Sequence, residues 1–124
     1  MMSTPLYIAC IHRHRDAIIL LIANGANINH GYNTKEGSPL HHLAYVNDVN
    51  IAELLIEHGA DVSSRDFKNN TPLHLAATTG ITTPITKMLI KNGASINATN
   101  NNGDTPIDVA RLRRHMQIRV AKNK

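Results

Sequence analysis

The chain has 124 residues, of which 42% are hydrophobic and 18% are charged, and its formal net charge is +4. This length suits one domain, and the composition is that of a folded protein and excludes an intrinsically disordered chain. Aromatic residues make up only 3% of the chain, which argues against a module that stacks nucleic-acid bases on aromatic rings. The longest apolar run, residues 17–23, is far shorter than the roughly 18 residues of a membrane helix, so no membrane contact is expected.

Positive charge is concentrated at the C-terminal end of the chain. Residues 1–110 hold seven Lys or Arg and nine Asp or Glu, whereas residues 111–124 hold six Lys or Arg and no acid. Because the larger part is slightly acidic, we do not expect the whole domain to bind nucleic acid. The N-terminus lacks the charged start and apolar stretch of a signal peptide, and the single cysteine, Cys10, excludes an internal disulfide. Both features predict a cytoplasmic protein.

Paired helices are predicted along the whole chain. Ser or Thr followed by Pro marks a helix start, because the hydroxyl accepts a first-turn N–H group and Pro fits the first helical position. Gly after an apolar stretch marks a helix end. The first helices of the pairs are expected at residues 5–12, 39–46, 72–79 and 106–113, and the second helices at residues 16–24, 49–58, 84–92 and 115–122. Polar segments rich in Asn and Gly predict turns between the pairs, at residues 29–37, 63–70 and 98–104.

The same markers recur with a period of 33 or 34 residues. The first marker is Thr4-Pro5-Leu6, which returns as Ser38-Pro39-Leu40, Thr71-Pro72-Leu73 and Thr105-Pro106-Ile107. The second marker is a Gly-Ala pair that begins at residues 25, 59 and 93, and the third is an apolar pair that begins at residues 20, 54 and 88. Three markers with one period indicate an array of repeated helix pairs.

Residues 71–77 (TPLHLAA) resemble the signature of ankyrin repeats, and residues 59–62 (GADV) resemble the turn that follows the second helix of such a repeat. The resemblance covers essentially the whole chain. It implies an all-α fold, an ankyrin-repeat solenoid of helix-turn-helix pairs with projecting hairpin loops, in which helices and hairpins form a continuous concave surface. A single domain would span residues 1–124, with repeats at about residues 4–37, 38–70, 71–104 and 105–124.

Three repeats depart from the ankyrin pattern. In the second repeat, His42 stands in a position that normally holds Leu. In the third, one extra residue precedes the second helix, and we expect the loop to absorb it while Thr83 caps that helix. In the fourth, Asp108 replaces the signature His and the second helix is short and polar, which resembles a terminal capping repeat.

The first repeat has no hairpin before it. Apolar side chains such as Leu6 and Ile11 would then lie on an outward face without a polar cap. This feature predicts self-association through the uncapped N-terminal repeat, or a longer array to which the chain belongs.

The eight histidines and one cysteine raise the question of a metal or catalytic site. The resemblance places His41 and His74 in the signature position, where the imidazole bonds to backbone across repeats. A closed zinc site needs about four converging ligands, usually with thiolates, so these scattered residues predict no metal site. Cys10 aligns with Ala44 and Ala77 in a small buried position, where it acts as an apolar residue. We therefore expect no enzymatic activity and no cofactor.

In ankyrin repeats the residues that read a partner lie on the hairpin tips and on the exposed face of the first helix. Carried over residue by residue, the resemblance gives as candidates Ile11, His12, Tyr45, Val46, Phe67, Lys68, Asn70, Thr78, Thr79, Asn101, Asn102, Asp104, Leu112 and Arg113. Phe67 and Tyr45 are candidate anchors, because aromatic residues often dominate the binding energy of protein interfaces. The alternative for Phe67 is that its ring packs sideways on the neighbouring hairpin.

The basic segment 111–124 has two interpretations. Its apolar residues Leu112, Met116 and Val120 repeat every four positions, which predicts a helix that packs on the third repeat while its charges are solvated. The alternative is that the segment contacts nucleic acid, anionic lipid or a nuclear import receptor.

The resemblance also implies two candidates for modification. An Asn at the start of the hairpin segment of ankyrin repeats can be hydroxylated by the asparaginyl hydroxylase of animal cells. Asn29 and Asn97 match this position, whereas Ser63 departs from it.

The predicted function is that of a non-enzymatic interaction module that binds another protein through the concave surface of hairpin tips and first helices. The many Asn and Ile residues are typical of AT-rich genomes, which suggests a host-directed ankyrin protein of an intracellular microbe or virus that acts in the host cytosol. Two alternatives stay open: a targeting or inhibitory module that uses its basic tail on nucleic acid or an import receptor, and a structural spacer within a larger protein.

Overall fold

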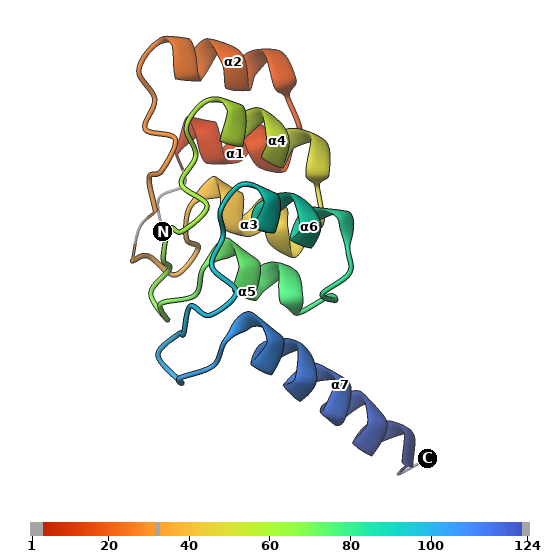
Figure 1. Cartoon of the computed structure of the whole chain (residues 1–124). Helices are drawn as coiled ribbons and strands as arrows, with labels where there is room; N and C mark the ends of the chain where they lie inside the picture. Colours follow the sequence, from red (N-terminus) through yellow and green to blue (C-terminus); the bar gives the residue numbers. More distant parts are fainter. Residues whose placement is uncertain (1–3, 32, 123–124) are drawn as a thin grey trace.

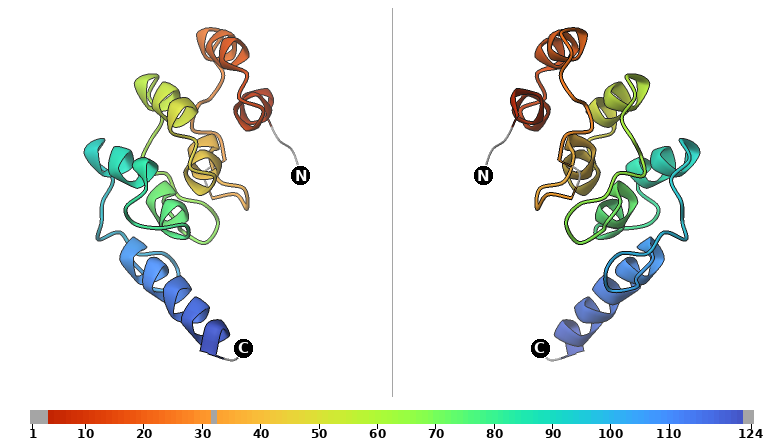
Figure 2. Two further views of the ribbon diagram at one scale, coloured as in Figure 1. Left: turned by 90° about the vertical axis from the view of Figure 1, so that its right-hand side faces the viewer. Right: turned by 90° about the vertical axis from the view of Figure 1, so that its left-hand side faces the viewer.

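The described part of the chain is a stack of helix pairs (Figure 1). The computed structural model describes residues 4–31 and 33–122, with the side chains of these ranges described up to residue 114. Its helices are α1 (Pro5–Ile11), α2 (Arg15–Ala23), α3 (Pro39–Tyr45), α4 (Val49–Glu57), α5 (Pro72–Ala77), α6 (Pro84–Lys91) and α7 (Pro106–Lys122). Helices α1, α3, α5 and α7 form an inner layer, and α2, α4 and α6 form an outer layer (Figure 2). Within these ranges there is no strand and no helix long and apolar enough to cross a membrane. The arrangement confirms the predicted all-α solenoid.

The helices begin at the predicted Thr-Pro signals. The Thr4 hydroxyl accepts the Tyr7 N–H at 3.1 Å at the start of α1. The Thr83 hydroxyl accepts the Thr86 N–H at 3.4 Å at the start of α6. The extra residue of the third repeat lies in the loop before Thr83, as predicted, and α6 still packs against both α5 and α4.

The outer helices end on a capping side chain followed by a glycine. Asn24 donates from Nδ2 to the Leu20 carbonyl, and Asn92 donates in the same way to the Met88 carbonyl, each at 2.8 Å. The next residue after α6 and its cap, Gly93, has a φ of 97°. A Cβ atom added there would meet no atom within 4 Å, so the glycine is needed for its backbone conformation and not for space.

His41 and His74 join successive repeats, as predicted. The Nδ1 atom of His41 accepts the Ser38 N–H at 3.0 Å. The proton of the neutral ring therefore lies on Nε2, which donates to the Asn70 carbonyl at 2.8 Å. His74 donates to the Asp104 carbonyl at the same distance. Burial lowers the pKa of both imidazoles, which favours the neutral form that this geometry needs.

The first repeat carries a different residue at the signature position. Tyr7 stands there, and among the described residues its hydroxyl makes no hydrogen bond to a backbone carbonyl. Its ring instead packs against His42, with the ring centroids 5.8 Å apart and the planes inclined by 55°. The His42 side chain thus faces the first repeat, where burial lowers its pKa.

The core lies between the two layers. Its largest buried aliphatic side chains are Leu6, Ile18, Leu40, Leu43, Leu55, Leu73, Ile85 and Leu89. Cys10 is buried among them, and burial raises the pKa of its thiol to about 12, so it is an apolar core residue. The expectation that Leu6 lies on the outward face is wrong. The exposed large apolar residues of the first repeat are Ile8, Ile11, Ile19 and Leu20. Ile8 differs from Leu6 because two residues turn a helix by about 200°.

The fourth repeat differs from the prediction of two helices at residues 106–113 and 115–122, because α7 is one continuous helix. At the corresponding turn of the first repeat, Arg13 has a φ of 58°, and its Nε lies 2.9 Å from Asp48 Oδ2 of the next repeat. Arg114 stands at the equivalent position, and no carboxylate of the described residues lies within ion-pair distance of it. Arg and Leu are good helix formers, and here they continue the helix.

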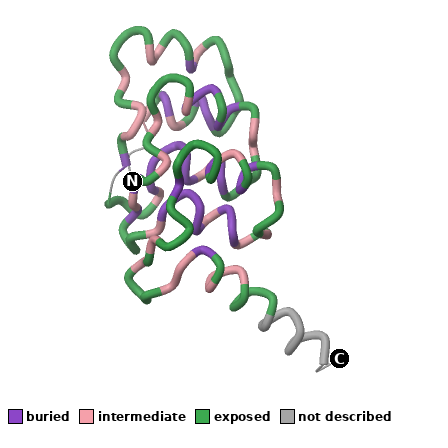
Figure 3. The backbone as a smooth tube through the Cα atoms, in the orientation of Figure 1, coloured by how far each residue is buried: buried purple, intermediate pink, exposed green. Residues whose placement is uncertain are grey.

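Helix α7 packs against α5 through its first turns, and its later turns point away from the stack (Figures 1 and 2). Exposure rises along this helix (Figure 3): Pro106 is buried, Val109 is half-buried and Leu112 is 53% exposed. The prediction that Leu112 lies in an inner stripe against the third repeat is therefore wrong. The side chains of Met116 and Val120 lie outside the described residues.

Candidate functional site

Backbone hydrogen bonds join the hairpin tips edge to edge. The Phe67 N–H donates to the Thr34 carbonyl at 2.9 Å, and the Asn101 N–H donates to the Lys68 carbonyl at 3.0 Å. Each tip is therefore held by its neighbour, and the tips together form one continuous edge.

Two side chains shape the later tips from inside. Asp66 Oδ1 accepts the N–H groups of Lys68 and Asn70, both at 2.9 Å. In the next hairpin, Asn100 Oδ1 accepts the N–H groups of Asn102 and Asp104, both at 3.0 Å. Because the turns carry their own hydrogen bonds, the side chains on them start from a fixed backbone.

Seven of the fourteen candidate residues line one hollow of about 410 Å³, which we call the C-terminal hollow. These seven are Lys68, Asn70, Thr78, Asn101, Asn102, Asp104 and Leu112. The remaining lining comes from His74, Leu75, Asn100 and Val109. The residues belong to α5, α7 and two hairpins, so the repeat architecture alone brings them together. The volume falls in the range of roughly 300–1,000 Å³ that is typical of ligand sites.

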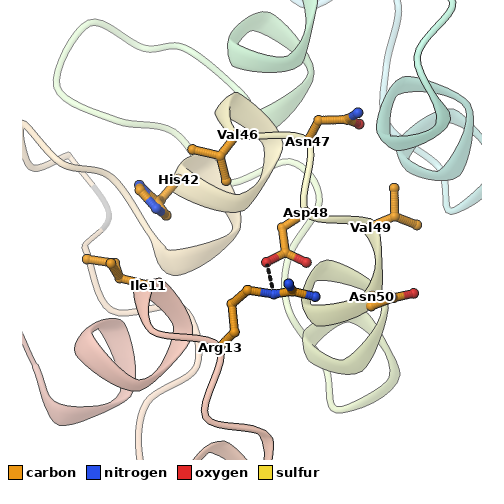
Figure 4. A pocket seen from close by; sticks show the side chains of 8 residues that line it. All are labelled: Ile11, Arg13, His42, Val46, Asn47, Asp48, Val49 and Asn50. Carbon is orange, nitrogen blue, oxygen red and sulfur yellow. Dashed lines mark ion pairs between the residues drawn. The ribbon is translucent and has the colours of Figure 1, made fainter.

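A second hollow, of about 520 Å³, lies where the α1–α2 turn meets the α3–α4 turn (Figure 4). We call it the N-terminal hollow. Two candidates, Ile11 and Val46, line it, and the other lining residues are Arg13, His42, Asn47, Asp48, Val49 and Asn50. Figure 4 shows the Arg13 guanidinium directed at the Asp48 carboxylate. Asp48 Oδ1 also accepts the Ile51 N–H at 3.3 Å and so caps α4. Both oxygens of this carboxylate therefore make contacts within the fold.

The two candidate aromatic anchors are accessible. The Phe67 side chain is 44% exposed and that of Tyr45 is 52% exposed. The Lys68 ammonium lies 5.5 Å from the centroid of the Phe67 ring, so this cation is next to both the ring and the C-terminal hollow. Contact of either ring with a partner stays a prediction.

The other candidates are more scattered. Thr79 is exposed at the end of α5, where its hydroxyl donates to the Ala76 carbonyl at 2.9 Å. His12 is exposed, with its ring 6.0 Å from that of His14. Arg113 is exposed on α7 and does not line either hollow.

Sequence reasoning missed several lining residues. Arg13 and Asp48 were not candidates. Arg13 has a positive φ, which is uncommon for a residue other than Gly, but this signal is visible only in the structure. Leu75 and Val109 were missed because nothing in the repeat pattern distinguishes a half-buried groove residue from a core residue.

The two candidate modification sites differ in environment. Asn29 is engaged by its neighbour, because its Oδ1 accepts the Asp61 N–H at 2.7 Å and its Nδ2 donates to the Gly59 carbonyl at 3.4 Å. Asn97 is exposed, and its backbone N–H bonds to Ser95 Oγ at 3.2 Å. Hydroxylation of either residue stays a prediction.

Within the described ranges, no group of three His, Cys, Asp or Glu residues is placed to hold a metal ion.

Comparison with known proteins gives matches along most of the chain. The family model described as ankyrin repeats (3 copies) matches residues 2–66, and the one described as ankyrin repeats (many copies) matches residues 55–110. The chain is 38% identical over 79 residues to Ankyrin repeat and SOCS box protein 11 of Danio rerio, covering 64% of this chain and 26% of that protein. It is 36% identical over 72 residues to Putative ankyrin repeat protein L371 of Acanthamoeba polyphaga mimivirus, covering 58% of this chain and 9% of that protein.

A third similarity is shorter. The chain is 48% identical over 48 residues to NF-kappa-B inhibitor alpha of Sus scrofa, covering 39% of this chain and 15% of that protein. The chain thus spans about a quarter or less of the length of these three curated relatives.

Proposed function

Because the chain belongs to the ankyrin-repeat family, we propose that it is a non-enzymatic module that binds a partner protein through its hairpin tips and inner helices. The observation that carries this proposal is the convergence of seven of the fourteen candidate residues on the C-terminal hollow. The hydrogen-bonded tips support it, because a surface that is ordered before binding loses less conformational entropy when the partner arrives.

The energy of such an interface is expected to come from a few anchors. Phe67 and Tyr45 are both exposed aromatic residues, and truncation of an anchor of this kind costs roughly 1–3 kcal/mol of binding free energy. Neither ring belongs to the buried core, so their removal leaves the fold in place.

The test compares one variant on the proposed surface with one on the outer layer. Phe67→Ala removes the candidate anchor, and Lys87→Ala removes an exposed side chain of α6. Partners captured from a candidate cell lysate are identified by mass spectrometry, and each is then titrated against both variants by calorimetry. We expect Phe67→Ala to weaken binding and Lys87→Ala to leave it unchanged. A partner that loses more affinity with Lys87→Ala uses the outer layer and contradicts the proposal. Unfolding of Phe67→Ala would instead assign that ring to the hairpin stack.

A second candidate function is contact of the basic end with nucleic acid or an import receptor. The observation in its favour is that Arg111, Arg113 and Arg114 are all exposed on α7. Binding to nucleic acid would weaken steeply with added salt, because phosphate contacts release counterions. A binding constant measured at two salt concentrations therefore separates this function from the first.

We also propose that the protein is host-directed and acts in the host cytosol. The similarity to a mimivirus ankyrin protein supports this role. Fluorescence microscopy of the tagged chain in host cells tests it, and exclusion from the cytosol would refute it.

A spacer role within a larger protein would be indicated if the chain captured no partner from the cell lysate.

A further inference from the structure

We infer that the C-terminal hollow receives an acidic segment of the partner protein, with an apolar side chain seated against Leu112. The inference rests on the proposed function and specifies the chemistry of the partner. It follows from the distribution of charge, the use of the local carboxylates, and the lining of the hollow.

Charge is divided along the stack. Residues 1–64 hold three Lys or Arg and six Asp or Glu, whereas residues 65–114 hold seven Lys or Arg and three Asp or Glu. The C-terminal hollow lies wholly in the second of these segments. The part of the chain around the hollow therefore carries a net positive charge, which favours acidic partners over basic ones, although two of its lysines lie on α6 in the outer layer.

The acids near the hollow are mostly occupied by the fold. Asp66 is buried and bonds to the backbone of its own hairpin. Asp108 Oδ2 accepts the Thr105 N–H at 3.0 Å, and this backbone hydrogen bond lowers the pKa of the carboxyl. Asp104 is the one acid that lines the hollow, and Lys68 is the one Lys or Arg that does.

The nearby cations divide into one structural residue, Arg65, and two exposed ones, of which Lys68 lines the hollow and Arg113 does not. The Arg65 guanidinium donates to the Asn69 carbonyl at 2.9 Å and to the Thr99 carbonyl at 2.8 Å, so it braces two hairpins. Lys68 and Arg113 are exposed. The described residues contain a single ion pair, that of the distant Arg13, so neither Lys68 nor Arg113 has a carboxylate partner within them.

Part of the lining of the hollow is apolar. Leu75 and Val109 are half-buried there, and Leu112 beside them keeps 53% of its surface exposed. Also in the lining, the Lys68 ammonium and the Asn102 side-chain amide take no part in hydrogen bonds among the described residues. An acidic side chain can accept from these two donors while a neighbouring apolar side chain covers Leu112.

This lining suits a peptide better than a nucleic acid. A phosphate backbone gains nothing from apolar lining residues, and single-stranded nucleic acid is normally held by aromatic residues on which bases stack. None of the lining residues of the hollow is a Phe, Tyr or Trp. The observations therefore favour a protein segment that combines carboxylates with an aliphatic or aromatic residue.

The first experiment uses the full chain as bait for a phage library of random peptides a dozen residues long. We expect the recovered peptides to be rich in Asp and Glu beside Leu, Ile, Met or Phe. Recovery of neutral or basic peptides overturns the inference, as does recovery of none. The proposed function is tested separately, by the effect of Phe67→Ala on the affinity for a captured partner. The inference and the proposed function can therefore fail independently.

The second experiment measures the affinity of one recovered peptide by fluorescence polarisation. Lys68→Glu should weaken binding by roughly tenfold or more, because it places like charge beside the bound acid. Lys87→Glu is the matched control, since it makes the same change of net charge at an exposed site on the outer layer. Equal losses from both variants would show an unspecific attraction and overturn the inference. Equal or tighter binding of a single-stranded oligonucleotide, with the same dependence on Lys68, would assign the hollow to nucleic acid and also overturn it.

Discussion

Leu20 and Leu54 occupy the same position in successive outer helices but differ in burial. Leu20 in α2 is 64% exposed, whereas Leu54 in α4 is 3% exposed. The two leucines are one period of 34 residues apart. Replacement of each by Ala therefore makes the same chemical change at the same helical position, and only the burial of the side chain differs.

The burial sets the expected loss of stability. Leu54→Ala removes a fully packed side chain and leaves a cavity, which costs about 2–5 kcal/mol. Leu20 has only about a third of its surface buried, and full burial of a leucine is worth about 1.5–3 kcal/mol, so Leu20→Ala should cost less than about 1 kcal/mol. The change in helix propensity is common to both variants and cancels in the comparison.

Urea unfolding followed by circular dichroism measures both free energies. Equal losses for the two variants would refute the reasoning, because they would mean that Leu20 is covered in solution. Repeating the melts at several protein concentrations identifies the cover. A loss for Leu20→Ala that grows with concentration would indicate self-association through the first repeat, as expected from its exposed Ile8 and Leu20.

The other predictions concern pH and the first turn. Because burial lowers the pKa of His41 and His74 in the folded state, the unfolded chain binds more protons below the ordinary imidazole pKa of about 6.5. The free energy of unfolding should therefore be highest above that pH and should fall as the pH drops below it. Urea melts across this range check the prediction, and a flat profile would contradict it. Arg13→Ala should cost at most about 1 kcal/mol, since its ion pair with Asp48 is largely solvent-exposed on the arginine side. Arg13→Gly should be the more stable of the two variants, because glycine relieves about 1–2 kcal/mol of strain at positive φ. Thermal melts that rank Ala above Gly would show that the turn is not strained.

The sequence predicted those parts of the fold that depend on local signals. A Thr-Pro pair caps a helix wherever it stands, so the starts at Pro5, Pro72 and Pro84 agree with the prediction. Gly93 ends its helix through a backbone preference that needs no neighbour. The cross-repeat bond of His74 to the Asp104 carbonyl could also be predicted, because the resemblance carries it.

Features that depend on contacts between repeats were not predictable in the same way. Arg13, in the turn between α1 and α2, contacts Asp48 of another repeat, whereas the corresponding turn is absent at Arg114. The side of α1 that Leu6 takes depends on where α2 and α3 pack. The hollow beside α7 depends on the convergence of four segments, so the sequence supplied seven of its residues without indicating that they surround one space.

The tyrosine at the first signature position makes the joints of the stack unequal in stiffness. His41 and His74 each pin a helix to the following hairpin through a bond of 2.8 Å, whereas Tyr7 meets the second repeat through a tilted ring contact with His42. The other side-chain contact described at this first joint is the Arg13–Asp48 ion pair, which is 60% exposed on the arginine side and is therefore worth little. We expect the molecule to flex at its first joint as at a hinge, while the part that carries the C-terminal hollow moves as a rigid block.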